Sequence, residues 1–255
     1  METPIRIVNA ATLVCLRRSR STTSSWDVLL GQSEVKNWLR STPSTTRIMR
    51  YPGEWKFPGG VVDEGDVSLE ATALRELQEE FLGMEPSGED PACIYFLGSK
   101  ITRPIQRRRH RMFNFIAFED ENESWMNTGA LECVNEALAM KREEFDTLIA
   151  SGRYWKLTEE QKMTVSPEIH RVQWFPIDVA IDMMGASVVD PHTPVDEWQR
   201  LQFDLHGVPK RDPMYISMRI LKDIAEFETR ESLRAHVRHQ VAPSLASVIE
   251  TQSSL

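Results

Sequence analysis

Three glutamates in one short stretch of the chain could hold a divalent cation. Glu76, Glu79 and Glu80 stand at positions i, i+3 and i+4, and side chains at these spacings are neighbours on a helix. Adjacent anions repel one another, so their proximity is costly unless a cation lies among them. Ligands that are all oxygen suit Mg²⁺ or Mn²⁺, which bind carboxylates together with water and substrate phosphates. The spacing therefore indicates a metal site that acts on a phosphate ester.

The same residues would also suit a solvent-exposed amphipathic helix. Its buried stripe would consist of apolar residues that recur at every fourth position: Leu69, Ala73, Leu77 and Phe81. On that interpretation Arg75 and Glu79 form an ordinary i,i+4 ion pair. The segment FPGG at 57–60 favours the metal site, because two consecutive glycines permit the close approach that a loop needs to fold back onto a helix.

The motif as a whole resembles the Nudix box, whose core Arg-Glu-x-x-Glu-Glu is intact as RELQEE at 75–80. Asp66 replaces the first glutamate of the box, and eight residues instead of seven separate it from Arg75. Two residues instead of one separate Glu80 from Gly83. We expect loops at the two helix ends to absorb both extra residues, which leaves the register of the three glutamates intact.

The resemblance implies a role for each matching residue. The ligands of Mg²⁺ or Mn²⁺ would be Glu76, Glu79, Glu80 and the backbone carbonyl of Gly60. The residues that hold the loop against the helix would be Gly59, Asp66 and Arg75. The resemblance also implies that water attacks one phosphorus of a diphosphate linkage, with Glu79 or Glu80 as the catalytic base within the box.

A carboxylate outside the box could also activate the water. Glu168 precedes a strand-like segment that ends in Trp174-Phe175-Pro176, and its position resembles that of a distal glutamate in mRNA decapping enzymes. The resemblance implies a catalytic role for Glu168. The alternative is that Glu168 is a surface residue that happens to precede a strand.

A second cluster of residues is cationic. Between positions 100 and 111 the sequence has no acidic residue, and its arginines are Arg103, Arg107, Arg108, Arg109 and Arg111. Arginine suits bidentate contacts with phosphate, so we predict that this loop binds substrate phosphate or an RNA backbone. A solvated loop that balances nearby acids is the alternative. Trp55, just before the glycine turn, could either stack on a base or fill the core.

The pattern of apolar residues predicts strands and helices of an α/β (α+β) fold, and the Nudix resemblance implies that a mixed β-sheet is sandwiched by helices. The expected strands are 5–16, 26–31, 93–99 and 111–118, and the expected helix of the box is 68–82. A polar loop is expected over 33–51, between the second strand and the glycine turn. This succession of a mixed sheet and a flanking helix is the one that the Nudix resemblance implies.

The second half of the chain departs from the family pattern. Residues of helical spacing predict an inserted helical arm at about 121–165, after which 168–178 resembles the segment that closes many Nudix domains. We therefore expect a Nudix domain over 1–185 and a helical C-terminal extension over 186–255 that packs on it. The helices of the extension are expected near 213–240 and 243–252.

Composition restricts the classes of partner. The chain has 255 residues and a formal net charge of −8, which argues against broad electrostatic coating of a nucleic acid but permits a local basic patch. No apolar run approaches the roughly 20 residues that a membrane span requires, so no membrane partner is expected. The basic N-terminal stretch is predicted to be the tip of a hairpin, and no targeting peptide is visible.

Two enzymatic interpretations and one binding interpretation follow, and the first enzymatic one is our prediction, with the other two as alternatives. Length, arm and motif order resemble mitochondrial Nudix proteins of kinetoplastids, which implies a 5′-RNA pyrophosphohydrolase in mitochondrial mRNA processing, with a pentatricopeptide-repeat RNA-binding protein as partner. The element FPGGVVDEGD at 57–66 resembles coenzyme A pyrophosphatases, which implies a coenzyme A or nucleoside-diphosphate substrate. A cytoplasmic location is the alternative to the mitochondrial one. A Nudix fold that binds RNA or a partner without hydrolysis is the third possibility.

Overall fold

A single mixed β-sheet organises the part of the chain that the structure describes. The computed structural model describes residues 6–20, 24–49, 53–82, 93–102, 108–122, 126, 128–185, 215–227 and 229–253. The strands are β1 (Arg6–Arg18), β2 (Trp26–Ser33), β3 (Trp55–Lys56), β4 (Gly59–Val61), β5 (Ile94–Ile101), β6 (Arg108–Phe118) and β7 (Ile169–Pro176). The predicted strands are therefore confirmed, and four of them are longer than the sequence indicated.

The long strand β1 is the centre of this sheet. The strand order is β3-β2-β1-β6-β5, while β4 pairs with β1 and β7 pairs with β2. The pairing of β1 with β6 is parallel, and the other pairings are antiparallel. Successive side chains of β1 enter opposite cores, with Leu13 on one face and Val14 on the other. Because both faces of β1 are buried, helices must cover the sheet on both sides.

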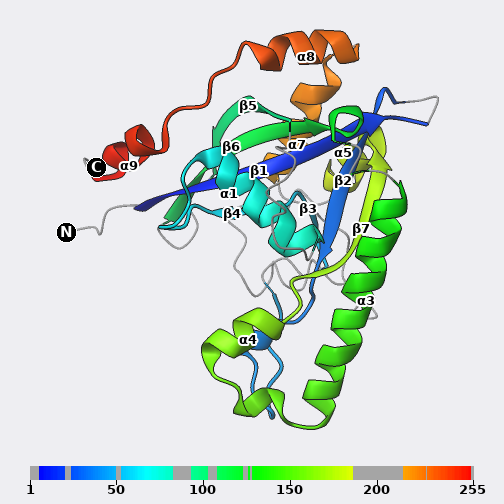
Figure 1. Cartoon of the computed structure of the whole chain (residues 1–255), viewed down its shortest axis with the longest axis vertical. Helices are drawn as coiled ribbons and strands as arrows, with labels where there is room; N and C mark the ends of the chain where they lie inside the picture. The colour runs from blue at the N-terminus through cyan, green and yellow to red at the C-terminus, as the bar shows by residue number, and fades with distance from the viewer. Residues whose placement is uncertain are drawn as a thin grey trace.

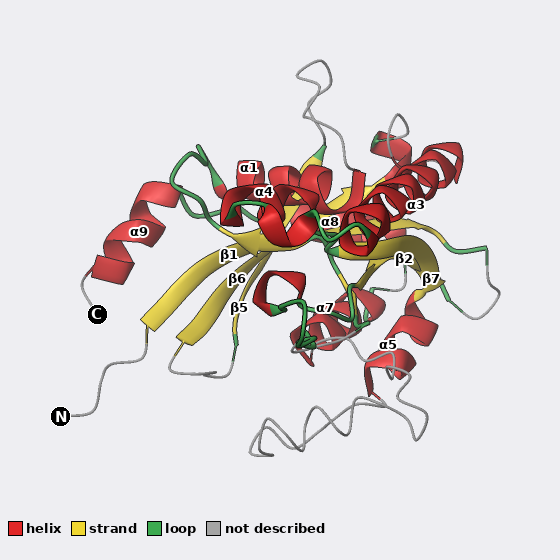
Figure 2. Cartoon of the chain, turned by 90° about the horizontal axis from the view of Figure 1, so that it is seen from below, coloured by secondary structure: helices red, strands yellow, loops and turns green. Residues whose placement is uncertain are grey.

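Helices do cover both faces, as the sequence predicted. One core contains residues of α5 (Ile177–Gly185), α7 (Tyr215–Ala225) and α8 (Arg230–Arg238), and the other contains residues of α1 (Leu69–Glu76), α3 (Thr128–Ala150) and α9 (Leu245–Ser253). Figure 2 shows α1 and α3 on one side of the sheet and α5 and α7 on the other. None of the helices in the described residues combines the length and the hydrophobicity needed to cross a membrane.

The C-terminal helices share the cores of the sheet. Leu221 of α7 and Leu233 of α8 are fully buried in one core, and Val248 of α9 is buried in the other. The region predicted as helical near 213–240 contains two helices, because the Thr229 side chain caps a new helix by accepting from the Ser232 N–H at 3.1 Å. The predicted division of the chain between 185 and 186 stays a prediction.

The predicted arm is a helical hairpin with a small core of its own. Figure 1 shows α3 running beside β7 and past the end of the sheet, after which η4 (Tyr154–Lys156) and α4 (Glu159–Val165) return. Phe145 and Tyr154 stack edge to face with ring centroids 5.2 Å apart, and Trp38 packs on Phe145 at 5.0 Å. Trp38 lies in η1 (Trp38–Arg40), within a region that the sequence predicted as a polar loop. The loop after β2 therefore anchors the arm.

Candidate functional site

The box helix forms as predicted but ends in an unpredicted way. The Ser68 side chain caps α1 by accepting from the Ala71 N–H at 3.1 Å, and the predicted apolar stripe is buried at every position: Leu69, Ala73, Leu77 and Phe81. From Leu77 to Leu82 the helix continues as the π-helix η2. A π-turn accommodates one more residue than an α-turn, so the extra residue after Glu80 lies within the helix. Our expectation that a loop absorbs it was wrong.

A bidentate ion pair between Arg75 and Asp66 connects the loop before α1 to the helix. The Arg75 Nε donates to Asp66 Oδ1 at 2.9 Å and Nη2 donates to Asp66 Oδ2 at 3.0 Å. Asp66 Oδ2 also accepts from the Asp63 N–H and the Thr72 hydroxyl. Burial alone would raise the pKa of Asp66, but these hydrogen bonds outweigh it and lower that pKa. Asp66 therefore reaches Arg75 despite the extra residue between them.

The two glycines of the turn bring β4 against both β1 and the box helix. In the sheet, Gly59 pairs with Thr12 and Gly60 with Ala11. A Cβ on Gly59 would lie 2.5 Å from the Ala11 carbonyl oxygen, and a Cβ on Gly60 would collide with the Glu76 carboxylate. A side chain at Gly59 would therefore disturb the backbone pairing with β1, and one at Gly60 would displace the Glu76 carboxylate. The predicted structural role of Gly59 is consistent with this geometry, and Gly60 lies directly against the first glutamate of the core motif.

Glu80 is the most deeply enclosed of the box glutamates. Its side chain is 6% exposed, Oε2 accepts from the Gly59 N–H at 3.1 Å, and Oε1 forms an ion pair with Lys56 Nζ. Burial alone would lower the pKa of Lys56, but attraction by Glu80, then by Glu168 and Glu76, raises it. Lys56 is therefore a permanent cation among the carboxylates.

Sequence reasoning missed Lys56, although the pattern contained a signal. In β3 and the residue after it, Trp55 and Phe57 enter one core. Because successive side chains of a strand alternate, Lys56 must point to the opposite face, where the box helix lies. Trp55 is fully buried, with its ring centroid 4.7 Å from that of Phe175. Of the two alternatives for Trp55, the structure shows the core residue rather than the base-stacking one.

Glu76 and Glu168 complete a group of crowded carboxylates around Glu80. Burial, followed by repulsion from Glu80, raises the pKa of Glu76 to about 7. Partial burial and repulsion from Glu80 also raise the pKa of Glu168, although its side chain keeps an exposed side. Raised values of this kind mean that the negative charges lack sufficient compensation. Glu168, predicted as a distal glutamate, therefore lies beside the box.

Glu79 lies apart from this group. Its side chain is 60% exposed, and Oε2 accepts from Arg75 Nη1 at 3.0 Å. Within the described residues, no three acidic, histidine or cysteine side chains converge in a metal-binding arrangement. The predicted set of Glu76, Glu79 and Glu80 is thus divided, and the structure groups Glu76 and Glu80 with Glu168. The donor set of this group is all oxygen and undercompensated in charge, which fits a hard divalent cation.

The predicted cationic loop is largely part of a strand. Arg103 and Arg107 lie outside the described residues, whereas Arg108, Arg109 and Arg111 belong to β6. There they pair with the first residues of β1, and Arg111 stands opposite Asn9. The Asn9 carbonyl accepts from the Val62 N–H in the loop before α1. Arg111 is therefore two strands from that loop, which is about 10 Å between Cα atoms. Whether these arginines bind phosphate stays a prediction.

The bidentate ion pair between Arg75 and Asp66 predicts that two matched substitutions change the free energy of unfolding by unequal amounts. We expect Asp66→Asn to lower the free energy of unfolding by about 1–3 kcal/mol, because it breaks a largely buried, multiply bonded ion pair. Asp63→Asn changes a carboxylate that is 70% exposed and 3.6 Å from Arg75, so its effect should stay below about 0.5 kcal/mol. Urea unfolding at pH 7 measures both. Equal losses of unfolding free energy in the two variants would contradict a special role for the bidentate ion pair.

The raised pKa of Glu76 predicts a pH-dependent stability in metal-free protein. Because the folded value is about 7 and the ordinary value 4.5, the folded state binds more protons between these limits, and stability falls as pH rises through them. Glu76→Gln should remove this loss, which is at most about 3 kcal/mol. Urea unfolding in EDTA from pH 5 to 8 measures it, and Glu79→Gln serves as the control. A wild-type slope in Glu76→Gln would refute the assignment.

The chain is similar in sequence to proteins of one family. A family model described as NUDIX domain matches residues 8–198. Over 42 residues the chain is 51% identical to the uncharacterized Nudix hydrolase NudL of Citrobacter koseri, and 48% identical to that of an Enterobacter species. Each match covers 16% of this chain and 22% of the relative, so the chain spans about a fifth of the length of these relatives.

Solved structures of the same kind resemble the chain at low sequence identity. A NUDIX hydrolase from Alicyclobacillus acidocaldarius has a TM-score of 0.48 at 15% identity, over 93% of this chain and 98% of that one. A mutT/nudix family protein from Listeria innocua has a TM-score of 0.43 at 15% identity, over 91% and 99%. These comparisons lend no support to the resemblance to kinetoplastid RNA-processing proteins. The family model spans well over half of the sequence and includes the glycine turn, the box helix and Glu168, and the chain belongs to the Nudix family.

Proposed function

We propose that this protein is a metal-dependent pyrophosphohydrolase that cleaves a diphosphate linkage. The observation that carries the proposal is the crowding of Glu76, Glu80 and Glu168 beside the Gly59–Gly60 turn of a Nudix domain. Crowded carboxylates with raised pKa values are costly to a fold, and they recur where a charge partner arrives from outside. A cation and a phosphorylated substrate together would supply that partner.

The cation would be Mg²⁺ or Mn²⁺. Glu76, Glu80 and the carbonyl of Gly60 would hold it, with Glu79 as the further ligand that the box predicts. When bound, such an ion offsets charge on the phosphate oxygens and orients the attacking water. Arg75 would keep Glu76 and Glu79 in place, since its Nη1 donates to both carboxylates at 2.9 and 3.0 Å.

Glu168 is the best candidate for the base that accepts the proton of the attacking water. Glu80 is tied to Lys56 and to the Gly59 N–H, and Glu79 is tied to Arg75. Glu168 has a pKa that burial and the neighbouring Glu80 raise, and its side chain has an exposed side, so it can meet a water molecule and accept its proton. The base role that the box assigned to Glu79 or Glu80 therefore passes to Glu168 in this proposal.

Two substrate classes are compatible with the site. A small nucleoside-diphosphate derivative, such as coenzyme A or ADP-ribose, is the first, and the element at 57–66 that resembles coenzyme A pyrophosphatases supports it. RNA with a 5′-triphosphate end is the second, and the arginines at the start of β6 support it. The mitochondrial location and the pentatricopeptide-repeat partner belong to this second candidate. A non-catalytic Nudix-fold binding module is the alternative to both.

Loss of one carboxylate tests the catalytic proposal. Glu80→Gln should lower kcat/KM by about 10²–10³ while the protein stays folded, because it removes charge from the enclosed part of the site. Glu136→Gln, on an exposed position of α3, should leave kcat/KM unchanged. Hydrolysis should cease in EDTA and return with Mg²⁺ or Mn²⁺. Turnover that survives chelation, or a wild-type rate in Glu80→Gln, would remove the proposal.

A substrate panel separates the two classes. We expect coenzyme A, ADP-ribose or a dinucleoside polyphosphate to have a higher kcat/KM than 5′-triphosphorylated or capped RNA, since the net charge of −8 opposes a polyanion. The RNA arm should be repeated with Arg109→Ala/Arg111→Ala and across a salt series. RNA as the best substrate, with a salt slope that flattens in that double variant, would make the second class correct. Absence of turnover on every substrate would favour the binding module.

A further inference from the structure

The catalytic proposal leaves Lys56 without a role, although its ammonium group lies among the crowded carboxylates. Lys56 Nζ forms an ion pair with Glu80 Oε1, and Glu168 and Glu76 are near enough to attract it. The side chain of Lys56 is 24% exposed and that of Glu80 is 6% exposed, so the ion pair is largely enclosed. A cation of the protein itself therefore occupies a position that a divalent cation would also favour.

The strand that carries Lys56 fixes its backbone. Trp55 and Phe57, on either side of Lys56, are buried in the opposite core, and Lys56 pairs with Gly31 of β2. Because successive side chains of a strand alternate, the Lys56 side chain points toward the box helix. Its four-carbon stem is flexible, so the ammonium can leave Glu80 while the backbone stays in place.

Both oxygens of the Glu80 carboxylate are bonded by the protein itself. Lys56 bonds Oε1, and Oε2 accepts from the Gly59 N–H at 3.1 Å. That N–H belongs to a backbone that the sheet holds, since Gly59 pairs with Thr12 of β1. A divalent cation bound to Oε1 would lie close to the ammonium, and two cations at one oxygen repel each other. The ammonium and the divalent cation therefore compete for this oxygen.

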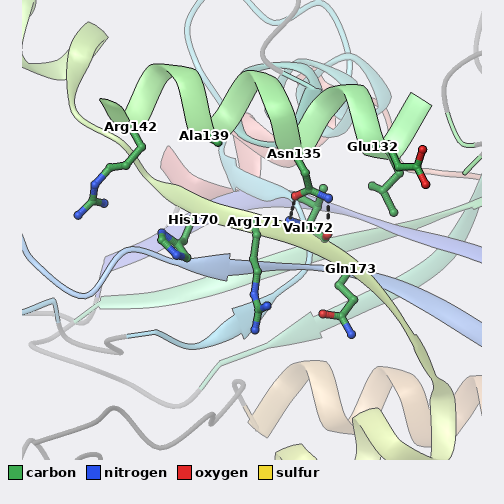
Figure 3. Close-up of a pocket in the computed structure, with 9 residues that line it drawn as sticks. Glu132, Asn135, Ala139, Arg142, His170, Arg171, Val172 and Gln173 are labelled. Carbon is green, nitrogen blue, oxygen red and sulfur yellow. Dashed lines mark hydrogen bonds between the residues drawn. The ribbon is translucent and has the colours of Figure 1, made fainter. Parts of the chain in front are cut away.

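Lys56 has fewer bonds than the other cation of the site. Arg75 donates to Asp66 through two nitrogens and also bonds two glutamates and a backbone carbonyl. Arg142, at one end of a groove between α3 and β7 (Figure 3), likewise pairs with two carboxylates. In the described part of the chain, by contrast, Glu80 is the only ion-pair partner of Lys56. Lys56 is therefore the cation of the site that can move away at the smaller cost.

We propose that Lys56 is an internal counterion, which occupies the divalent-cation site of the metal-free enzyme and is displaced when the cation binds Glu80. The inference rests on the proposed function and adds a control on its metal dependence. Because the ammonium must leave, the affinity for Mg²⁺ or Mn²⁺ is lower than the carboxylates alone would give. The Glu80 carboxylate keeps a partner when no metal is present, and an enclosed carboxylate without a partner destabilises a fold.

Removal of the ammonium tests the inference without changing a carboxylate. Lys56→Met removes the charge and keeps the length of the side chain, whereas Lys56→Arg keeps the charge. Lys100→Met is the matched control, because Lys100 is also 24% exposed and pairs with Asp223 of α7, on the other side of the sheet. In calorimetric titrations of metal-free protein with Mn²⁺, we expect a Kd about tenfold lower or more for Lys56→Met than for wild type. Lys56→Arg and Lys100→Met should not bind Mn²⁺ more tightly than wild type.

Thermal unfolding provides a second readout that does not need catalysis. In EDTA, Lys56→Met should unfold at a lower temperature than wild type, because the Glu80 carboxylate loses its partner. Mn²⁺ should raise the unfolding temperature more in Lys56→Met than in wild type, since the tighter ligand stabilises the folded state more. Lys56→Gln, which is neutral and can still donate a hydrogen bond, repeats both measurements if Lys56→Met does not fold.

The outcomes separate this inference from the catalytic proposal. Mn²⁺ binding by the neutral variants that is equal to or weaker than that of wild type would overturn the inference, while metal-dependent hydrolysis would still support catalysis. Tighter Mn²⁺ binding by the neutral variants, in a protein that hydrolyses no diphosphate, would uphold the inference and refute the catalytic proposal. Absence of Mn²⁺ binding in wild type and in every variant would refute both.

Discussion

The close contact between the Gly60 backbone and the Glu76 carboxylate is the constraint on which the site depends. Because Gly60 has no side chain, β4 can lie against the box helix and against β1 at the same time. Arg75 then joins the loop after β4 to the helix through Asp66. A side chain at Gly60 would displace the Glu76 carboxylate, and the carboxylates would lose their common position.

Crowded negative charge follows from that close packing, and two cations of the chain limit its cost. Arg75 lies outside the group and bonds Glu76 and Glu79, whereas Lys56 lies inside it and bonds Glu80. Their compensation is incomplete, since the pKa values of Glu76 and Glu168 remain raised. Uncompensated negative charge therefore remains at the point where an external cation and a phosphorylated substrate would bind.

Local sequence patterns predicted the parts of this protein that depend on local interactions. The alternation of β1, the stripe of α1 and the glycine turn each specify their own geometry, so the fold and the neighbourhood of the box could be predicted. The position of Lys56 depends on a strand of two residues, and the π-helix at Leu77–Leu82 depends on how one extra residue is absorbed. Both are tertiary outcomes that spacing alone does not determine.

The same distinction explains why the arm could be predicted as a helix but not as a wall of a groove. Helical spacing predicted the arm at 121–165. The role of Asn135 depends on β7, because its amide bonds the carbonyl and the N–H of Val172 at the edge of that strand. Likewise Trp38 was predicted to lie in a polar loop, because the sequence does not show that its ring packs against Phe145 and Tyr154 of the arm. The box carries the carboxylates common to the family, and the insertion lies along the strand that begins beside Glu168. Selection among substrates is therefore expected to depend on the insertion, because it is the element that shapes the space next to the reacting phosphates.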